Sequence, residues 1–354
     1  MNKIINILKK RKSIPLDKFI DISLYDKKYG YYMKKNPIGK KNDFITSPLI
    51  SNLFGEMIAI WCVSFWEHLG KPSKIIIVEM GPGDGSLCND LLITLKNFKN
   101  FFSCLEIKLL EKSDKLKKIQ KIKIRNNKVQ WIKKINDIKS GPIIFIGNEF
   151  FDALPIKQVY KKRKKFFEKY VTFSKFNKKL QFLFKKANKK LILDIKKHNL
   201  ISKDGVIEYP IEAIEYLKII SKKLKKYNGG LLSFDYGYLN KKNQDTLQSV
   251  QKHNYVDVLS NPGNTDITSH INYKLFSKFL IKNNLLVEKI VNQNEFLQKL
   301  GIVERANQFS KNKNFKKKAE IYYRLKRLLN YGEMGNLFKV LFAKKKNKRF
   351  SLGF

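Results

Sequence analysis

The segment Lys74–Leu87, KIIIVEMGPGDGSL, restricts the possible folds of this chain more than any other part of the sequence. Its run of apolar, β-branched residues, Ile75–Val78, is typical of a strand that is buried on both faces of a parallel sheet. An acid, Glu79, ends the run, and three glycines follow in alternation with other residues: Gly81, Gly83 and Gly85. Because glycine lets the backbone turn sharply and approach a bound molecule closely, the segment predicts a strand, a ligand-binding turn and a helix over Ser86–Lys96.

The spacing of these glycines distinguishes between possible ligands. The dinucleotide fingerprint requires Gly-x-Gly-x-x-Gly, which this turn does not contain. The pattern is acid-x-Gly-x-Gly-x-Gly, and it resembles the first motif of class I S-adenosylmethionine-dependent methyltransferases. In those enzymes the glycines hold the methionine half of the cofactor, and a carboxylate after the second strand holds the ribose. The resemblance implies that Glu79 and the three glycines bind S-adenosyl-L-methionine, whereas an ordinary strand–helix turn is the alternative that the motif alone leaves open.

The rest of the chain alternates between strand-like and helix-like segments. Strands are expected at the following positions: Lys74–Glu79, Cys104–Leu110, Val129–Ile132, Pro142–Gly147 and Gly230–Phe234. Helices are expected between or after them, at Lys112–Ile122, Ile211–Lys225 and Tyr273–Lys282 among others. This alternation predicts an α/β fold, a Rossmann-like class I methyltransferase sheet with parallel strands.

Composition and pattern divide the chain into four expected parts. An N-terminal helical cap carries two lid loops, Tyr25–Tyr32 and Gly39–Pro48, and an inserted strand-rich segment contains an antiparallel β-hairpin. The expected parts are 1–72 for the cap, 73–157 and 206–300 for the methyltransferase core, 158–205 for the insert, and 301–354 for a C-terminal helical extension. Within the core, residues 97–103 and 245–268 are expected to be loops.

Several polar side chains are expected at one edge of the sheet. Glu79, Glu111, the Asn148-Glu149 pair and Asp235 each end or follow a predicted strand, and ligands of such sheets bind at the carboxyl ends of the strands. Carboxylates gathered at one edge repel each other unless they meet a cation or a hydrogen-bond donor. S-adenosylmethionine offers a sulfonium, an ammonium and ribose hydroxyls, so we expect Glu111 to hold the ribose. The alternative for Glu111 is an acid that interacts with the dipole of the following helix.

The segment Gly147–Pro155, GNEFFDALP, follows the fourth predicted strand, and the resemblance to class I methyltransferases implies that it holds the methyl acceptor. Asn148 can hydrogen-bond a polar nitrogen, and Glu149 and Asp152 can attract a cation. An acceptor such as guanidinium is hard to deprotonate, so a site that methylates it requires carboxylates nearby. The alternative is a capped turn in which Asn148 and Asp152 only satisfy backbone N–H groups, and it applies more strongly to Asp152 than to Glu149.

The net charge of +43 raises the question of nucleic-acid binding. Only seven of the 73 basic residues are arginine, and the lysines are spread along the whole chain. Together with abundant Asn, Ile and Phe, this composition indicates an AT-biased genome, so no dedicated nucleic-acid site is expected. Three dispersed cysteines and four histidines indicate neither a disulfide framework nor a metal site. No membrane span or secretory signal is expected.

Seven segments, in order along the chain, resemble the MidA family of class I methyltransferases. They are Asp43–Pro48, Phe54–Glu56, Glu79–Leu87, Asn148–Pro155, Asp235–Gly237, Gly263–His270 and Met334–Lys339. This family is related to the mitochondrial complex I assembly methyltransferase, which symmetrically dimethylates an arginine of a complex I subunit. One position departs from the family pattern, because Asp84 stands where the family usually has arginine.

The resemblance implies a methyltransferase that acts on a protein arginine side chain, with a complex I subunit as the candidate substrate. An RNA methyltransferase and a non-catalytic, cofactor-binding assembly factor are the alternatives that the residues leave open. A bacterial protein of this kind is expected in the cytoplasm and a eukaryotic one in the mitochondrial matrix.

Overall fold

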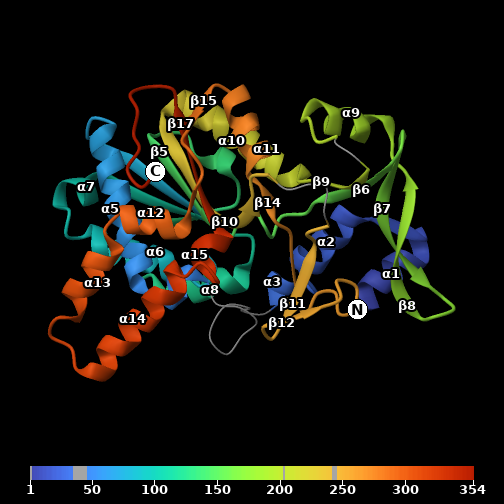
Figure 1. Cartoon of the computed structure of the whole chain (residues 1–354), viewed down its shortest axis with the longest axis horizontal. Coiled ribbons are helices and arrows are strands. Elements are labelled where there is room, and N and C mark those ends of the chain that lie inside the picture. The colour runs from blue at the N-terminus through green and yellow to red at the C-terminus, as the bar shows by residue number, and fades with distance from the viewer. Residues whose placement is uncertain (1, 35–45, 202–203, 241–244) are drawn as a thin grey trace.

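A computed structural model describes residues 2–34, 46–201, 204–240 and 245–354 of the chain. A nine-stranded sheet forms its centre (Figure 1). Its main strands, in spatial order, are β15 (Leu285–Val287), β17 (Phe338–Lys345), β10 (Gly229–Tyr238), β5 (Ile143–Asn148), β2 (Ile75–Met80), β3 (Leu105–Leu110) and β4 (Val129–Ile132). The five strands from β10 to β4 are parallel, and β17 runs antiparallel to β10 and β15. Two short strands, β14 (Ile271–Asn272) and β16 (Val291–Asn292), pair with β10 and β17.

Helices cover both faces of this sheet, because alternate residues of its strands point to opposite sides. Ile75 and Ile77 of β2 pack into one hydrophobic core and Ile76 and Val78 into the other. The first core is covered by α5 (Asn52–His68), α6 (Ser86–Leu95), α7 (Lys99–Cys104), α12 (Gln293–Lys299), α13 (Ile302–Ser310) and α14 (Phe315–Leu329). The second is covered by α9 (Lys189–Lys197), α10 (Ile211–Tyr227) and α11 (Tyr273–Lys282). The remaining helical segments of this part are α8 (Asp114–Lys123) and three short ones, α4 (Ser47–Ile50), η1 (Ile135–Asp137) and α15 (Met334–Leu337).

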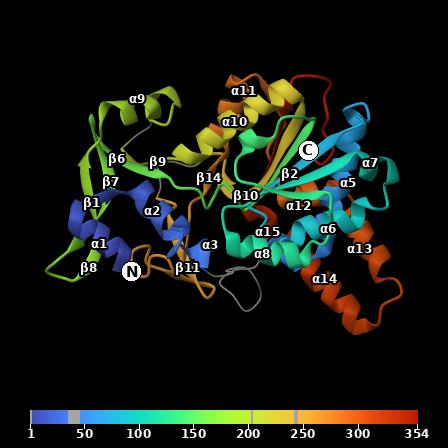
Figure 2. The ribbon, with the colours of Figure 1, turned by 180° about the vertical axis from the view of Figure 1, so that it is seen from behind.

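A second, antiparallel sheet lies beside the first (Figure 2). Its strands are β1 (Ser13–Pro15), β6 (Lys157–Lys162), β7 (Lys165–Ser174), β8 (Lys179–Lys186) and β9 (Gly205–Tyr209). The N-terminal helices α1 (Asn2–Arg11) and α2 (Leu16–Tyr25) pack on it through a third hydrophobic core. A three-stranded sheet of β12 (Asn254–Val256), β11 (Gln248–Gln251) and β13 (Asp266–Thr268) lies next to α3 (Tyr31–Lys34), as both views show.

The parallel α/β architecture predicted from the sequence is confirmed, and β4 and α11 have the predicted bounds. The prediction of a loop over residues 245–268 is wrong, because β11 pairs with β12 and β13 there. The loop expected over residues 97–103 is also wrong, since α7 occupies Lys99–Cys104. These strands and this helix are too short to show a clear hydrophobic period. Their secondary structure therefore depends on contacts with other parts of the chain.

Two further features were not predicted. The hairpin β7–β8 exists, but it belongs to a larger sheet in which β1 of the N-terminal region pairs with β7. Strand β17, near the C-terminus, lies within the central sheet beside β10. Most of the expected lid loop Gly39–Pro48, up to residue 45, is outside the described residues. Among the helices of the described residues, none is both long and apolar enough to cross a membrane.

Candidate active site

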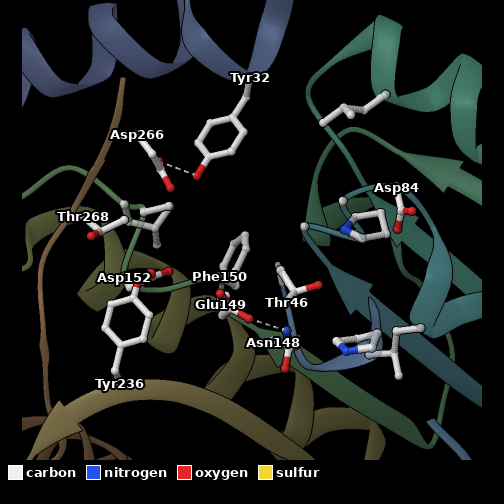
Figure 3. Close-up of a pocket in the computed structure, with 18 of the residues that line it drawn as sticks. Tyr32, Thr46, Asp84, Asn148, Glu149, Phe150, Asp152, Tyr236, Asp266 and Thr268 are labelled. Carbon is white, nitrogen blue, oxygen red and sulfur yellow. Dashed lines mark hydrogen bonds between the residues drawn. The ribbon is translucent and has the colours of Figure 1, made fainter. Parts of the chain in front are cut away.

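A cavity of about 500 Å³ opens at the carboxyl ends of β2, β3 and β5 (Figure 3). It brings together seven of the eight predicted site residues: Glu79, Gly81, Gly83, Glu111, Asn148, Glu149 and Asp152. The eighth, Gly85, is not in its lining. Side chains from the N-terminal helices and from β11–β13 complete the walls. The position agrees with the rule that ligands of open parallel sheets bind beyond the strand ends.

The glycine turn adopts the backbone conformation that its sequence requires. Gly81, Gly83 and Gly85 have φ of +66°, +55° and +84°, a region that favours glycine. A Cβ at Gly81 would lie 3.0 Å from the ring of Phe150, and one at Gly85 would lie 2.8 Å from Ile124. Gly81 and Gly83 therefore shape the cavity wall, whereas Gly85 allows the turn to pack against the end of α8.

Asp84, the residue that departs from the family pattern, has partners within the protein. Its carboxylate accepts hydrogen bonds from the Ser86 backbone N–H and hydroxyl, both at 3.0 Å, at the start of α6. Lys123 forms an ion pair with it at 2.5 Å and also donates to the Ser86 hydroxyl. The negative charge introduced at this position is thus compensated by Lys123.

Glu79 is buried and incompletely partnered. Its Oε2 has no hydrogen-bond partner among the described residues. Burial, together with the nearby carboxylates of Asp84, Asp90 and Glu111, raises the pKa of Glu79 to about 8. A cation bound beside Glu79 would favour its ionised form, so this side chain is suited to a positively charged part of a ligand.

Glu111 is held in place by a network that also contains the glycine turn. Its two carboxylate oxygens accept from the Ser113 N–H at 2.7 Å and from Gln120 Nε2 at 3.1 Å. Gln120 also donates to the Gly83 carbonyl at 2.8 Å and accepts from Trp131 at 2.8 Å. Burial raises the pKa of Glu111, although these hydrogen bonds oppose the shift. The network fixes the carboxylate beside the turn, where it can accept hydroxyl hydrogen bonds from a ribose.

The proposed acceptor end of the cavity contains Glu149 in a strained conformation. Its φ is +52°, which is uncommon for a residue with a side chain, and its N–H donates to the Phe234 carbonyl at 2.8 Å. Its carboxyl group accepts from Asn148 Nδ2 at 3.3 Å and from the Ser47 backbone N–H. Burial, and then the charge of Asp152, raises the pKa of Glu149 well above its usual value.

Asp152 belongs to a buried cluster with two residues from the end of β10. Asp152 is hydrogen-bonded to the side chains of Tyr236 and Asp235, and burial raises its pKa. Asp235 accepts from the Ser233 hydroxyl at 3.2 Å and the Phe151 N–H at 3.4 Å. Because two adjacent buried carboxylates cannot both ionise easily, the pKa of Asp235 lies well above its usual value, through burial and then the charge of Asp152.

Among the residues that line the cavity, Tyr236 and Asp266 had no individual role assigned from the sequence, and Tyr25 and Tyr32 were predicted as part of a lid loop. The Tyr32 hydroxyl donates to Asp266 at 2.7 Å, and the Tyr25 hydroxyl donates to the Ala153 carbonyl at 3.0 Å. The rings of Tyr25 and Tyr32 stack with centroids 5.7 Å apart. The aromatic segment Tyr25–Tyr32 signalled a lid, but the sequence could not show that its tyrosines reach β13 and the acceptor segment.

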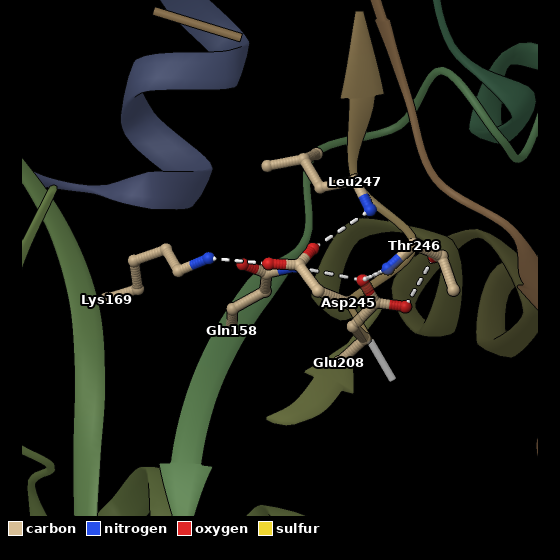
Figure 4. A network of polar contacts seen from close by, with 6 residues as sticks. All are labelled: Gln158, Lys169, Glu208, Asp245, Thr246 and Leu247. Carbon is tan, nitrogen blue, oxygen red and sulfur yellow. Dashed lines mark hydrogen bonds and ion pairs between the residues drawn. The ribbon is translucent and has the colours of Figure 1, made fainter. Parts of the chain in front are cut away.

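A polar network behind the cavity connects the antiparallel sheet to the segment before β11 (Figure 4). Gln158 Nε2 donates to Glu208 at 2.9 Å and to Asp245 at 2.6 Å, and Lys169 pairs with Asp245 at 2.9 Å. Thr246 donates to Glu208 through its backbone N–H at 2.8 Å and its hydroxyl at 2.6 Å. These bonds fix the start of β11, whose Gln248 and Val250 line the cavity.

Residues 57–291 match a protein family described as "Putative S-adenosyl-L-methionine-dependent methyltransferase". Similar proteins include the protein arginine methyltransferase NDUFAF7, mitochondrial, of Xenopus laevis, 29% identical over 96% of this chain and 83% of that protein. The Caenorhabditis elegans homolog of the same name is 32% identical over 88% of this chain and 77% of that protein. A crystal structure from Burkholderia thailandensis bound to S-adenosyl-homocysteine has the same fold, with a TM-score of 0.85 and 21% identity over 99% of this chain and 92% of that one.

The fold and the match over residues 57–291 define the class of protein. The chain belongs to the S-adenosyl-L-methionine-dependent methyltransferase family that the sequence motifs indicated. It is therefore an enzyme that uses S-adenosylmethionine, and the cavity residues fit that cofactor. Glu79 offers an unpartnered carboxylate for a cationic group, Glu111 offers acceptors for hydroxyls, and a Cβ at Gly81 would narrow the turn. The cofactor supplies an activated methyl group, and the protein supplies orientation and a place for the proton.

Proposed function

We propose that this enzyme transfers the methyl group to the guanidinium of an arginine side chain in a protein. The observation that carries the proposal is the group of carboxyl side chains at one end of the cavity. Glu149, Asp152 and Asp266 line it there, and Asp235 lies behind Asp152. Three buried oxygens in this region, Asn148 Oδ1, Asp152 Oδ1 and Asp235 Oδ1, have no hydrogen-bond partner among the described residues. A guanidinium provides five N–H donors in a plane and a positive charge, which match these acceptors.

The raised pKa values have a direct chemical consequence. Without a cation, burial favours the protonated forms of Glu149 and of the Asp152–Asp235 pair. A guanidinium would favour their ionised forms, and the ionised Glu149 would orient a nitrogen for in-line attack on the sulfonium methyl carbon. The S–CH₃ bond breaks as the N–CH₃ bond forms, and the nitrogen then loses one proton. A carboxylate of this cluster is the group that accepts that proton.

The aromatic side chains support the same acceptor. Tyr25, Tyr32 and Tyr236 line the cavity together with these carboxyl groups. A planar cation is attracted both to carboxylates and to the faces of aromatic rings. The hydrogen bonds from Tyr32 to Asp266 and from Tyr25 to Ala153 close the cavity on the side of the N-terminal helices, which would keep water from the reacting atoms.

For the protein that carries the arginine, we propose a subunit of respiratory complex I. The support is the resemblance of the seven sequence segments to the MidA family, whose eukaryotic relative modifies such a subunit. Relatives named as mitochondrial arginine methyltransferases match over most of this chain, which agrees with that choice. Mass spectrometry of complex I subunits from a deletion strain would reveal a methyl group that is lost with the gene.

The test of the acceptor site is the substitution Glu149→Gln, which keeps the shape of the side chain and removes its charge. Methyl transfer to protein arginine should fall by orders of magnitude, while cofactor affinity measured by calorimetry should persist. Asp152→Asn should have a smaller effect, because Asp152 already has hydrogen-bond partners in Tyr236 and Asp235 and an asparagine can keep such bonds. Asp114→Asn, an exposed carboxylate at the start of α8, is the matched control and should transfer at the native rate.

Transfer at the native rate by Glu149→Gln would mean that the acceptor binds elsewhere. Label that appears in RNA instead of protein would support an RNA methyltransferase. Cofactor binding without transfer to any protein or RNA would support a non-catalytic assembly factor.

A further inference from the structure

Two cationic side chains, Lys112 and Arg327, line the described part of the cavity wall. Lys112 has partners within the protein, because its Nζ pairs with Glu212 at 3.1 Å and lies 4.7 Å from the centroid of the Tyr25 ring. Arg327 is half-buried, and no described residue forms an ion pair or hydrogen bond with it. A guanidinium that is partly removed from water, lines a cavity and has no acidic partner among the described residues is suited to an anionic group of a ligand.

Arg327 lies on the same side of the cavity as the glycine turn. Arg327 lies in the last turn of α14, which packs against α4. The α4 segment in turn contacts α6, the helix that begins directly after the glycines. Thr46 and Pro48, at the start of α4, line the cavity between these elements. Arg327 therefore belongs to the wall that continues from the glycine turn through α4 to α14.

The charges of the other lining residues restrict where an anionic part of a ligand can lie. Glu79 and Asp152 are buried acids and Glu149 is half-buried, and in its ionised form each would repel a carboxylate. S-adenosylmethionine carries one carboxylate, at the methionine end, next to its ammonium group. Arginine binds carboxylates through two parallel N–H···O bonds, which lysine cannot form.

We propose that Arg327 binds the carboxylate of S-adenosylmethionine and thereby fixes the methionine end of the cofactor. The inference rests on the cofactor that the family uses and is independent of which acceptor is methylated. It makes the C-terminal helix α14 part of the cofactor site. Arg324, one turn earlier on α14, provides a contrast, because it pairs with Glu320 and does not line this cavity.

The test compares two ligands that differ in the amino-acid part. S-adenosylhomocysteine contains the carboxylate and the ammonium, whereas 5′-methylthioadenosine lacks both. A hydrogen-bonded charge pair contributes about 1.5–3 kcal/mol, so Arg327→Gln should weaken binding of S-adenosylhomocysteine by at least about tenfold. Its affinity for 5′-methylthioadenosine, measured by the same calorimetric titration, should stay within about twofold of the native value.

Two further variants make the comparison specific. Arg324→Gln should leave the affinity for both ligands unchanged, because Arg324 is paired outside the cavity. Arg327→Lys should regain part of the lost affinity, because it restores the charge without the bidentate geometry. Thermal unfolding of each variant shows whether α14 has remained packed.

Three results would overturn the proposal. Equal losses for both ligands would show that Arg327 supports the cavity structurally and does not bind the carboxylate. Unchanged affinity for S-adenosylhomocysteine would place the carboxylate elsewhere. A raised KM for the protein acceptor with unchanged cofactor affinity would assign Arg327 to the acceptor chain.

Discussion

The high pKa of Glu79 predicts that cofactor binding depends on pH. In the ligand-free enzyme burial and neighbouring acids raise this pKa to about 8, so Glu79 is protonated at neutral pH. If a cationic group of the cofactor lies beside Glu79, binding favours the ionised form and releases a proton. By linkage, the affinity for the cofactor should then rise roughly tenfold for each pH unit in the interval between the pKa of Glu79 in the complex and its pKa in the ligand-free enzyme.

The measurement is a calorimetric titration of S-adenosylhomocysteine at pH 6 and pH 7, in two buffers of different ionisation enthalpy. An α-amino group has a pKa of about 7.7–8.0, so the ligand itself remains largely protonated over this interval. We expect about tenfold tighter binding at pH 7 than at pH 6 and the release of nearly one proton. Glu79→Gln should remove both effects.

Asp90 is the matched control, because burial raises the pKa of this carboxyl to about 7 and it contributes to the field at Glu79. It does not line the cavity, so Asp90→Asn should retain the pH dependence of binding. Native affinity that is the same at pH 6 and pH 7, or a dependence that persists in Glu79→Gln, would refute the placement of a cation beside Glu79.

Four other predictions concern different parts of the structure. Gly83→Val should abolish cofactor binding in calorimetry while the thermal unfolding of the domain persists, because a β-branched residue is strained at φ of +55° and would fill the turn. Glu111→Ala should weaken cofactor binding by at least about tenfold, since charged hydrogen bonds to ribose hydroxyls contribute about 1.5–3 kcal/mol; a change below about twofold would refute its role. Asp245→Asn should raise KM for the acceptor more than for the cofactor, because the network of Figure 4 fixes β11. RNA should bind only weakly and lose affinity at physiological salt in filter binding; tight binding with a defined footprint would contradict this.

Glu79 also has a consequence for stability, with a definite sign. Its pKa is raised in the folded enzyme, so between about pH 4.5 and pH 8 the folded state binds more protons than the unfolded state. The free energy of unfolding of the ligand-free enzyme should therefore decrease as pH rises through this interval. Denaturant unfolding of Glu79→Gln should show a weaker decrease, and an equal or steeper one would contradict the burial of an unpaired carboxyl.

The sequence predicted those parts of the site that follow from local pattern. The glycine turn follows the predicted strand that ends at Glu79, and the Asn148-Glu149 pair follows another predicted strand. Because the ends of parallel strands meet at one edge of the sheet, local pattern was enough to bring these residues together. The structure places Glu79, Glu111 and Glu149 in one cavity accordingly. Gly85 was predicted to bind the cofactor but does not line the cavity. It packs against Ile124 at the end of α8, a contact with a distant part of the chain that local pattern does not reveal.

Several contacts of the site join distant parts of the chain, and the sequence pattern does not reveal them. Tyr32 meets Asp266, and Asp152 meets Asp235, although neither pair is close in the sequence. Arg327 is one of many basic residues, and only the packing of α14 on α4 distinguishes it. Strand β17 was missed for the same reason, since its antiparallel partner β10 lies far away in the chain.

The most direct test of the central claim is the transfer itself. Purified enzyme and S-adenosylmethionine with a deuterated methyl group are incubated with protein and RNA extracted from a deletion strain, and both fractions are analysed by tandem mass spectrometry. We predict the labelled methyl group on an arginine side chain of a protein, with the native enzyme but not with Glu149→Gln. Label found on RNA, on another amino acid, or equally with Glu149→Gln would contradict the proposed function.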